Sequence, residues 1–367
     1  MSSKKILIVT SEFPPQPGGI GNHAYNLAQQ LQLNDFSVTV LTDVRSKDGF
    51  EEQQFDANLP FKVVRTKRYK IIGFTYLKRI ITYKRLVAKS KLVLASGKFS
   101  LWLVGSDPFF NKLHAYAVIH GSELNLKGFN KRLTDSALLN FNTIIAVSNY
   151  TKSLIAHVKQ SNVMVIPNGF NLENSTIKTS KKVPFTTIES PILITVGNVS
   201  ERKGQLNVIK ALPLLIEKYP KTHYHIVGIP TEQNGFMEIA KKLKVESHLT
   251  FHGQVSQQKK LQLLKESTIF VMLSNRTQSG DVEGFGIAIL EANALGLPAI
   301  GSNDCGIVDA INEGVSGELV HPTDINGFVQ KVAQVSSNYK AYQVGAKEWS
   351  SEFRWEVVIK NYINIFE

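Results

Sequence analysis

Short apolar runs alternate with segments of helical periodicity along the chain. In the first half, runs typical of buried strands occupy residues 6–9, 37–41, 101–104, 116–119, 143–147 and 163–166. Apolar residues recur at helical spacing in residues 22–33 and 150–158. Alternation of strand and helix favours a parallel, doubly wound sheet with helices on both faces.

The alternation starts again at residue 192. Strand-like runs occupy residues 192–196, 223–227, 249–252, 269–273 and 299–301, and helical spacing marks 205–218, 236–243, 257–266 and 286–296. The intervening residues 172–190 are rich in Ser, Thr and Lys and poor in apolar residues, which is typical of a linker. Because 367 residues exceed one typical core, we expect two domains, 1–171 and 191–349, followed by a C-terminal segment, 350–367.

The composition is that of a globular protein in a reducing compartment. Hydrophobic residues make up 43% of the chain and charged residues 20%. The single cysteine, Cys305, excludes an internal disulfide framework. The apolar run near the N-terminus is too short for a signal peptide, and no run is long enough for a transmembrane helix. We therefore expect a cytoplasmic protein.

The positive charge is confined to one half of the chain. Residues 1–170 hold 22 Lys and Arg against 10 Asp and Glu, whereas residues 171–367 hold 20 of each. Residues 57–106 contain 12 basic residues and no acidic one. Such a segment suits nucleic acid, an anionic membrane or an anionic substrate.

The sequence VEGFGIAILEANALGLP, residues 282–298, combines two glutamates with a short helix. Glu283 and Glu291 stand eight positions apart, and the pattern predicts a helix from Gly286 to Gly296. A helix that opens on glycines leaves free N–H groups at its positive end, which favours anion binding. The arrangement suits a diphosphate with a hydroxyl-bearing group on each side.

This stretch resembles the E-x7-E motif of the retaining, nucleotide-sugar-dependent glycosyltransferases of family 4, which have the GT-B fold. The resemblance implies two doubly wound, Rossmann-like α/β domains that face a central cleft. It implies an N-terminal acceptor-binding domain, a C-terminal nucleotide-sugar-binding domain, and a final helix near residues 350–366 that crosses back to the first domain. It also implies that Glu283 touches the transferred sugar and Glu291 the ribose of the nucleotide.

Further motifs match the same family. His120 stands in an H-G context that implies contact with the transferred sugar, and Lys203 matches a lysine on the donor diphosphate. Asn198 occupies the usual arginine position, so Arg202 becomes a candidate for the missing charge. The expected catalytic residues are Glu283, His120 and Lys203. The expected donor-binding residues are Gly18, Gly19, Arg202, Lys203, Gly253, Gln254, Val255, Glu283, Gly284, Phe285, Gly286, Ile287 and Glu291.

Two alternatives from other classes remain open. Residues 19–24 match G-x-G-x-x-A, close to the dinucleotide fingerprint of an NAD(P)-dependent oxidoreductase, although the loop before them is too long for the tight turn that the fingerprint needs. The basic segment alone would suit a nucleic-acid-binding protein. Under the favoured interpretation the protein binds no nucleic acid. No D-x-D or zinc-spaced cluster occurs, so we expect no metal and no cofactor, the nucleotide sugar being a substrate.

Residues 62–98 interleave basic residues with apolar ones. On a helical wheel over residues 74–94 the apolar side chains form two stripes, one through Phe74, Leu77 and Ile81 and one through Tyr76, Ile80 and Tyr83. One stripe suits the domain core and the other a bilayer interface. We therefore expect a hexosyltransferase that associates peripherally with the inner face of an anionic membrane. Its donor is a UDP- or GDP-sugar, and its acceptor is a glycan or a lipid-linked molecule of surface polysaccharide or glycolipid synthesis.

Overall fold

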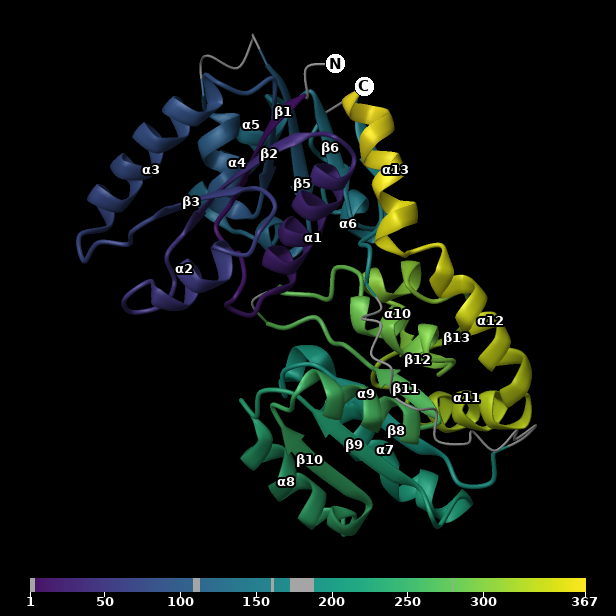
Figure 1. The fold of residues 1–367 in the computed structure, drawn as a ribbon. Coiled ribbons are helices and arrows are strands. Elements are labelled where there is room, and N and C mark those ends of the chain that lie inside the picture. Colours follow the sequence, from purple (N-terminus) through teal and green to yellow (C-terminus); the bar gives the residue numbers. More distant parts are fainter. Residues whose placement is uncertain (1–3, 108–112, 160–161, 172–187, 279) are drawn as a thin grey trace. The chain divides into compact units, whose positions relative to one another are not determined.

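The computed structural model describes residues 4–107, 113–159, 162–171, 188–278 and 280–367 (Figure 1). The chain divides into two compact units. Unit 1 comprises Met1–Gly169 and Trp355–Glu367, and unit 2 comprises Phe170–Arg354. Most of the expected linker, 172–187, lies outside the described residues, whereas Ile188 packs in the core of unit 2.

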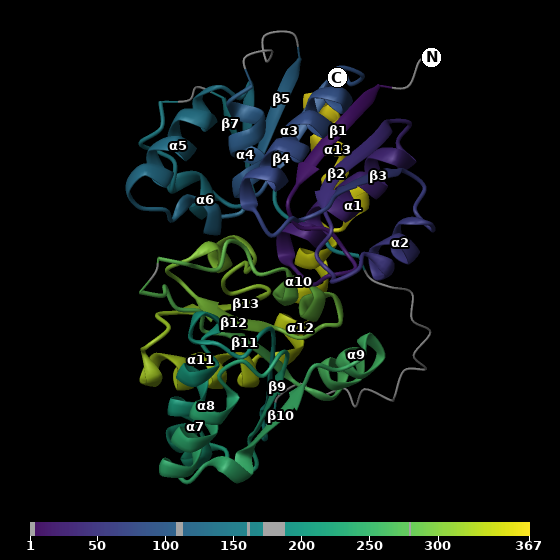
Figure 2. The same ribbon diagram turned by 90° about the vertical axis from the view of Figure 1, so that its left-hand side faces the viewer.

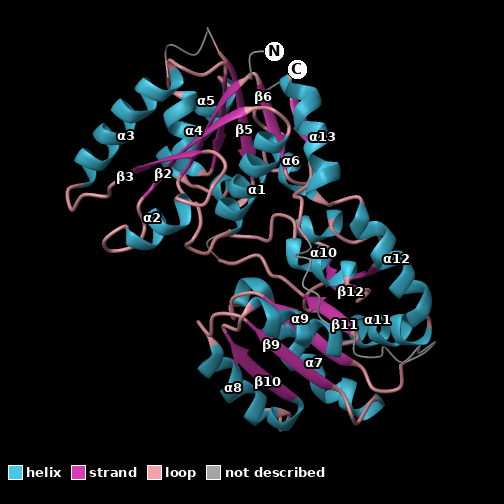
Figure 3. Ribbon diagram, viewed as in Figure 1, coloured by secondary structure: helices cyan, strands magenta, loops and turns pink. Residues whose placement is uncertain are grey.

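Unit 1 is built on a parallel sheet of seven strands (Figure 3). The strands are β1 (Lys5–Thr10), β2 (Ser37–Asp43), β3 (Lys62–Thr66), β4 (Leu92–Ser96), β5 (His114–Ile119), β6 (Thr143–Ala146) and β7 (Val163–Val165). Their order is β3-β2-β1-β4-β5-β6-β7. Ile6 lies between Val38 of β2 and Leu92 of β4, so the order reverses at the β1–β4 pair. Strands β1 and β4 are almost wholly buried, as a sheet covered on both faces requires.

Helices cover both faces of this sheet. They are α1 (Gly19–Leu33), α2 (Phe50–Asp56), α3 (Ile72–Val87), α4 (Lys98–Gly105), α5 (Gly128–Leu139), α6 (Asn149–Ser153) and α13 (Trp355–Phe366). Because crossovers are right-handed, helices reached on opposite sides of the reversal cover opposite faces. Accordingly α1 packs beside α13, while α4 packs beside α5 (Figures 1 and 2).

Unit 2 has a parallel sheet of six strands. They are β8 (Ile192–Val196), β9 (His223–Val227), β10 (Leu249–Gly253), β11 (Ile269–Met272), β12 (Ala299–Ser302) and β13 (Gly317–Val320), in the order β10-β9-β8-β11-β12-β13. The helices are α7 (Gln205–Lys218), α8 (Gln233–Lys242), α9 (Gln257–Glu266), α10 (Ile287–Ala294), α11 (Ile325–Ser337) and α12 (Tyr339–Ser351). The order reverses at the β8–β11 pair, just as it does at β1–β4 in unit 1.

The α/β fold class is confirmed, but several elements differ from the sequence-based expectation. Residues 101–104 are not a strand: they belong to helix α4. A short apolar run cannot distinguish a buried strand from an apolar turn of a helix, since four residues are too few to show a period. The helix expected at 150–158 ends already at Ser153.

The helical wheel drawn over residues 74–94 is too long. Helix α3 ends at Val87, and residues 92–96 form strand β4. Within α3, Tyr83 is buried against the core while Phe74, Leu77 and Ile81 are each more than half exposed. Of the other stripe, Tyr83 faces the domain, whereas Tyr76 and Ile80 are 37% and 43% exposed, so the expected division into one buried and one outward stripe is only partly right. The C-terminal segment likewise holds a break rather than one helix, because α12 stops at Ser351 and α13 starts at Trp355.

Candidate functional site

The reversal of strand order in unit 2 brings two loops together. In doubly wound sheets, ligands bind at the carboxyl ends of the strands where the order reverses. The loop after β8 runs to a 3₁₀ turn, Glu201–Lys203, and the loop after β11 carries residues 274–286. Arg202, Lys203 and Glu283, all predicted as site residues, lie on these two loops and meet there.

Glu283 holds both cations. Its Oε2 accepts hydrogen bonds from Arg202 Nη1 and from Lys203 Nζ, each at 2.6 Å. Asp281 accepts a longer contact from Arg202 Nε, at 3.3 Å. Burial raises the pKa of the Glu283 carboxyl, but attraction to Lys203 and Arg202 outweighs it and the net pKa lies below the usual range. One oxygen of the carboxylate therefore contacts two cations, and the Glu283 side chain is only 14% exposed.

Two glycines bring the backbone of these loops close together. Gly204 has φ +73°, and a Cβ there would overlap the carbonyl of Leu273, the first residue after strand β11. A Cβ on Gly306 would overlap the carbonyl of Gly284, and the Gly306 N–H donates to the Glu283 carbonyl at 2.9 Å. Any larger residue at either position would displace the cations or the carboxylate.

Helix α10 presents its N-terminus beside this cluster. It starts at Ile287 after Gly286, which has φ +98° and has no side chain to cap the first N–H groups. Phe285 is buried and anchors the turn before the helix. The predicted positive helix end is therefore present, a turn away from Glu283 in sequence.

Glu291 lies within α10, as expected, but has a partner that the sequence did not indicate. Its Oε2 accepts a hydrogen bond from Lys260 Nζ at 2.8 Å, and Lys260 belongs to α9. No local pattern links residues 31 positions apart on two helices.

Two of the residues expected to contact the base lie at the end of β10. Gly253 has φ +67°, and its carbonyl accepts a hydrogen bond from the Gly228 N–H. Gln254 is exposed in the loop that follows β10.

Asn198 does not supply a charge to the cluster. It is exposed, and its backbone carbonyl accepts a hydrogen bond from Gln205 Nε2 at 3.0 Å. The guanidinium that reaches Glu283 comes from Arg202 instead.

In unit 1, His120 follows β5 and is held on three sides. Its Nε2 lies 3.0 Å from Ser96 Oγ, its backbone N–H donates to Glu123 Oε1 at 2.5 Å, and its ring packs edge-on to His23 at 5.0 Å. Burial lowers the pKa of His120 to about 4, so its imidazole is neutral near pH 7. Burial raises the pKa of Glu123 to about 7. Glu123 is visible in the H-G-S-E sequence, but its hydrogen bond with the His120 backbone is visible only in the fold.

The remaining expected glycines lie at the start of α1. Gly18 immediately precedes the helix, and a Cβ there would overlap the carboxylate of Glu12, whereas the space beside Gly19 is open. Eight residues, 11–18, separate the end of β1 from α1. That loop is longer than the tight turn of a dinucleotide fingerprint, which argues against the oxidoreductase alternative.

The described residues hold neither a metal-binding cluster nor a membrane-spanning helix. Among the described residues, no three His, Cys, Asp or Glu side chains are grouped to hold a metal ion. Within the same part of the chain, no helix has the length and apolar character needed to span a bilayer.

Comparisons with known proteins agree with this geometry. Residues 17–174 match the Glycosyltransferase Family 4 domain and residues 176–348 match Glycosyl transferases group 1. The chain is 24% identical, over its full length and 98% of the relative, to a GDP-mannose-dependent monoacylated alpha-(1-6)-phosphatidylinositol monomannoside mannosyltransferase of Corynebacterium glutamicum. It is 24% identical to a related mannosyltransferase of Mycolicibacterium smegmatis, with 96% of this chain and 94% of the relative covered.

Solved structures show the same fold. A glycosyltransferase of Rickettsia africae has a TM-score of 0.78 at 20% identity, covering 100% of this chain and 98% of its own. Anabaena Alr3699/HepE, solved with UDP and glucose, has a TM-score of 0.74 at 18% identity, with 99% of both chains covered. Taken with the paired cations on Glu283 and the open helix end of α10, these matches establish that the chain belongs to the group 1, family 4 glycosyltransferases, nucleotide-sugar-dependent retaining enzymes of the GT-B fold.

Proposed function

We propose that this enzyme transfers a hexose from a nucleotide-sugar donor to a hydroxyl of a lipid-linked glycan acceptor, in the synthesis of a surface polysaccharide or glycolipid. The observation that carries the proposal is the cluster of Arg202 and Lys203 on Glu283, beside the N-terminus of α10. Cations and helix N–H groups suit a diphosphate leaving group, and the carboxylate suits a sugar hydroxyl.

The proposed chemistry uses electrostatic stabilisation rather than a covalent nucleophile. Cleavage of the anomeric C–O bond develops negative charge on the diphosphate and positive charge on the sugar. Lys203, Arg202 and the N–H groups at Gly286–Ile287 would stabilise the leaving group. Glu283 would orient the transferred sugar, and the neutral imidazole of His120 would offer it a hydrogen bond. The acceptor hydroxyl would attack from the face that the diphosphate leaves, which retains the configuration.

GDP-mannose is the proposed donor. Two full-length relatives are named as GDP-mannose-dependent mannosyltransferases of phosphatidylinositol mannosides. The segment RTQSGDVEGFG, which ends at Gly286, resembles the longer loop of some mannosyltransferases. A thermal-shift panel of UDP- and GDP-sugars tests the choice, because a ligand at 100 times its Kd stabilises the folded state by about 2.7 kcal/mol. Selective stabilisation by UDP-sugars would overturn the GDP-mannose assignment.

Peripheral membrane binding through α3 is part of the proposal. Ile72, Phe74, Leu77 and Ile81 are between 53% and 65% exposed, which is unusual for large apolar residues on one helix. The surrounding charges within residues 57–106 are all basic. A helix with an exposed apolar face and flanking cations suits the interface of an anionic membrane.

The structure changes which basic residues are available to such a surface. Arg79 is 8% exposed and pairs with the buried Asp43, and Lys84 pairs with Asp107. Arg79 and Lys84 therefore form ion pairs within unit 1. Lys78 and Arg85, in contrast, have no carboxylate within ion-pairing distance among the described residues.

Liposome co-sedimentation tests this part of the proposal. Binding should require anionic lipid and fall as salt rises, since each surface cation contributes about 1 kcal/mol. Replacing Leu77 and Ile81 by Ser, or Lys78 and Arg85 by Ser, should weaken it. The matched control is Lys241→Ser and Lys242→Ser on α8, which should leave binding unchanged. Equal binding to neutral liposomes, or none, would contradict membrane association.

A further inference from the structure

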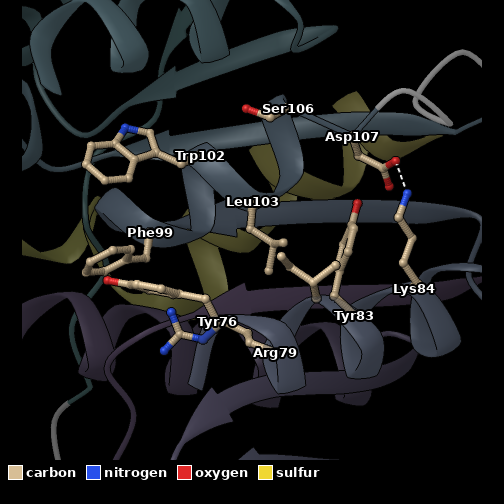
Figure 4. A pocket seen from close by; sticks show the side chains of 10 residues that line it. Tyr76, Arg79, Tyr83, Lys84, Phe99, Trp102, Leu103, Ser106 and Asp107 are labelled. Carbon is tan, nitrogen blue, oxygen red and sulfur yellow. Dashed lines mark hydrogen bonds and ion pairs between the residues drawn. The ribbon is translucent and has the colours of Figure 1, made fainter. Parts of the chain in front are cut away.

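A cavity of about 460 Å³ lies between α3 and α4 of unit 1. Its walls are mainly aromatic and aliphatic: Tyr76, Ile80, Tyr83, Phe99, Trp102 and Leu103. Figure 4 shows the rings of Tyr76, Phe99 and Trp102 grouped at one end, the Lys84–Asp107 ion pair at the other, and Leu103 between them. The volume falls in the range of small-molecule sites.

The charged groups around this cavity already have partners. Lys84 pairs with Asp107, and the Arg79 guanidinium pairs with Asp43. A sugar or a nucleobase needs several hydrogen-bonding groups that the site can offer to it. The lining instead offers mostly apolar surface, so the chemistry that fits is a hydrocarbon chain.

Two residues that line the cavity are part of the exposed surface of α3. Tyr76 and Ile80, which line it, are 37% and 43% exposed, and Leu77 and Ile81 continue the apolar surface on the neighbouring side of the helix. A chain entering from a bilayer that α3 contacts would therefore pass from one apolar surface to another without crossing water.

Cations lie beside the aromatic end. Lys98 Nζ lies 5.4 Å from the centroid of the Phe99 ring and 5.3 Å from that of Trp102, and Lys78 projects from the same helix as Tyr76. The acidic residue of the lining, Asp107, lies at the opposite end of the cavity and pairs with Lys84. The positive charge at the aromatic end suits an anionic group attached to the chain, of which a phosphate is the common form in membrane lipids.

We propose that the α3–α4 cavity binds one hydrocarbon chain of a phosphate-bearing lipid and so holds the lipid part of the acceptor. The inference rests on the proposed function for the identity of that lipid as acceptor. The binding site itself requires only the residues of unit 1.

Soluble n-alkyl phosphates of 8–14 carbons, used below their micellar concentrations with the full-length protein, are suitable probes. Affinity should rise by about three- to fourfold per added methylene until the cavity is filled. A probe brominated on its chain should quench Trp102, one of three tryptophans, and the quenching should disappear in Trp102→Phe. Alcohols of the same chain length should bind more weakly, because they lack the phosphate.

Two variants should fill the cavity, and a control variant leaves its lining unchanged. Leu103→Trp occupies its centre, and Ser106→Trp, at an exposed position of the lining, does so with less demand on folding. Both should lower probe affinity at least tenfold. Leu77→Ser with Ile81→Ser, outside the lining, should weaken liposome binding but leave probe affinity unchanged. The proposal would be overturned if the probes did not bind, or if their affinity did not depend on chain length. It would also be overturned if both filled variants bound the probes as tightly as the wild-type protein does. Since no donor or turnover enters this measurement, its failure and a failed donor test are distinguishable.

Discussion

Replacing Glu283 by Ala should separate nucleotide binding from sugar transfer. In the structure this one carboxylate forms an ion pair with both Arg202 and Lys203, each at 2.6 Å. Hydrogen bonds to charged groups contribute about 1.5–3 kcal/mol each, so a diphosphate that recruits these cations must compete with Glu283 for them. Without the carboxylate, both cations are available to the diphosphate alone.

We therefore expect the Kd for the nucleoside diphosphate to stay unchanged or to fall by up to about tenfold, roughly 1.4 kcal/mol. Turnover should fall at least about 10³-fold, near 4 kcal/mol of lost transition-state stabilisation, because the transferred sugar loses the group that orients it. An enzyme that binds its product nucleotide more tightly and yet transfers no sugar is the expected signature.

Calorimetry with GDP and UDP measures the first quantity, and release of nucleoside diphosphate from the nucleotide sugar measures the second. The matched control is Asp281→Asn, because Asp281 also contacts Arg202 but at 3.3 Å and with a side chain 42% exposed. It should change neither quantity by more than about twofold. If Glu283→Ala loses nucleotide affinity in proportion to activity, or keeps full turnover, the assignment of Glu283 to the sugar is wrong.

Three further predictions follow from the same geometry. Glu291→Ala should weaken nucleotide binding by about 1–3 kcal/mol, whereas Lys260→Met should leave nucleotide binding unchanged. If the two variants lowered the stability of the fold equally and neither changed nucleotide binding, the Glu291–Lys260 pair would be a structural contact only. Activity should persist in excess EDTA, and Lys203→Ala should lower donor affinity and rate together, since that lysine and backbone N–H groups meet the diphosphate charge; loss of activity restored by Mn²⁺ or Mg²⁺ would contradict this. Burial raises the pKa of Glu123 from 4.5 to about 7, so the stability that its protonated form contributes is full below pH 4.5 and is lost as pH rises through 7. Glu123→Gln should therefore gain about 2 kcal/mol relative to wild type between about pH 5.5 and 8.5, measured by hydrogen exchange of the β5 amides, and a difference independent of pH would refute a buried titrating carboxyl.

Local periodicity was sufficient for much of the framework. The expected bounds of residues 192–196, 205–218, 223–227 and 257–266 agree with β8, α7, β9 and α9. A strand or helix is determined by hydrogen bonds and apolar spacing within a few residues, which the sequence displays directly. The same reasoning failed for residues 101–104, where four apolar residues fit a buried helix as well as a strand, and for the extent of α3.

Motifs that can be recognised without a structure are enough to single out Glu283, Glu291, Lys203 and His120 as candidate site residues. The partners of these side chains are visible in the fold alone. Arg202 rather than Asn198 reaches Glu283, Lys260 holds Glu291, and the Tyr83 stripe of α3 ends in a cavity against α4. Such partners lie tens of residues apart and meet because parallel crossovers and the reversal of strand order bring distant loops to one sheet edge, a consequence of the whole sheet that no local segment encodes.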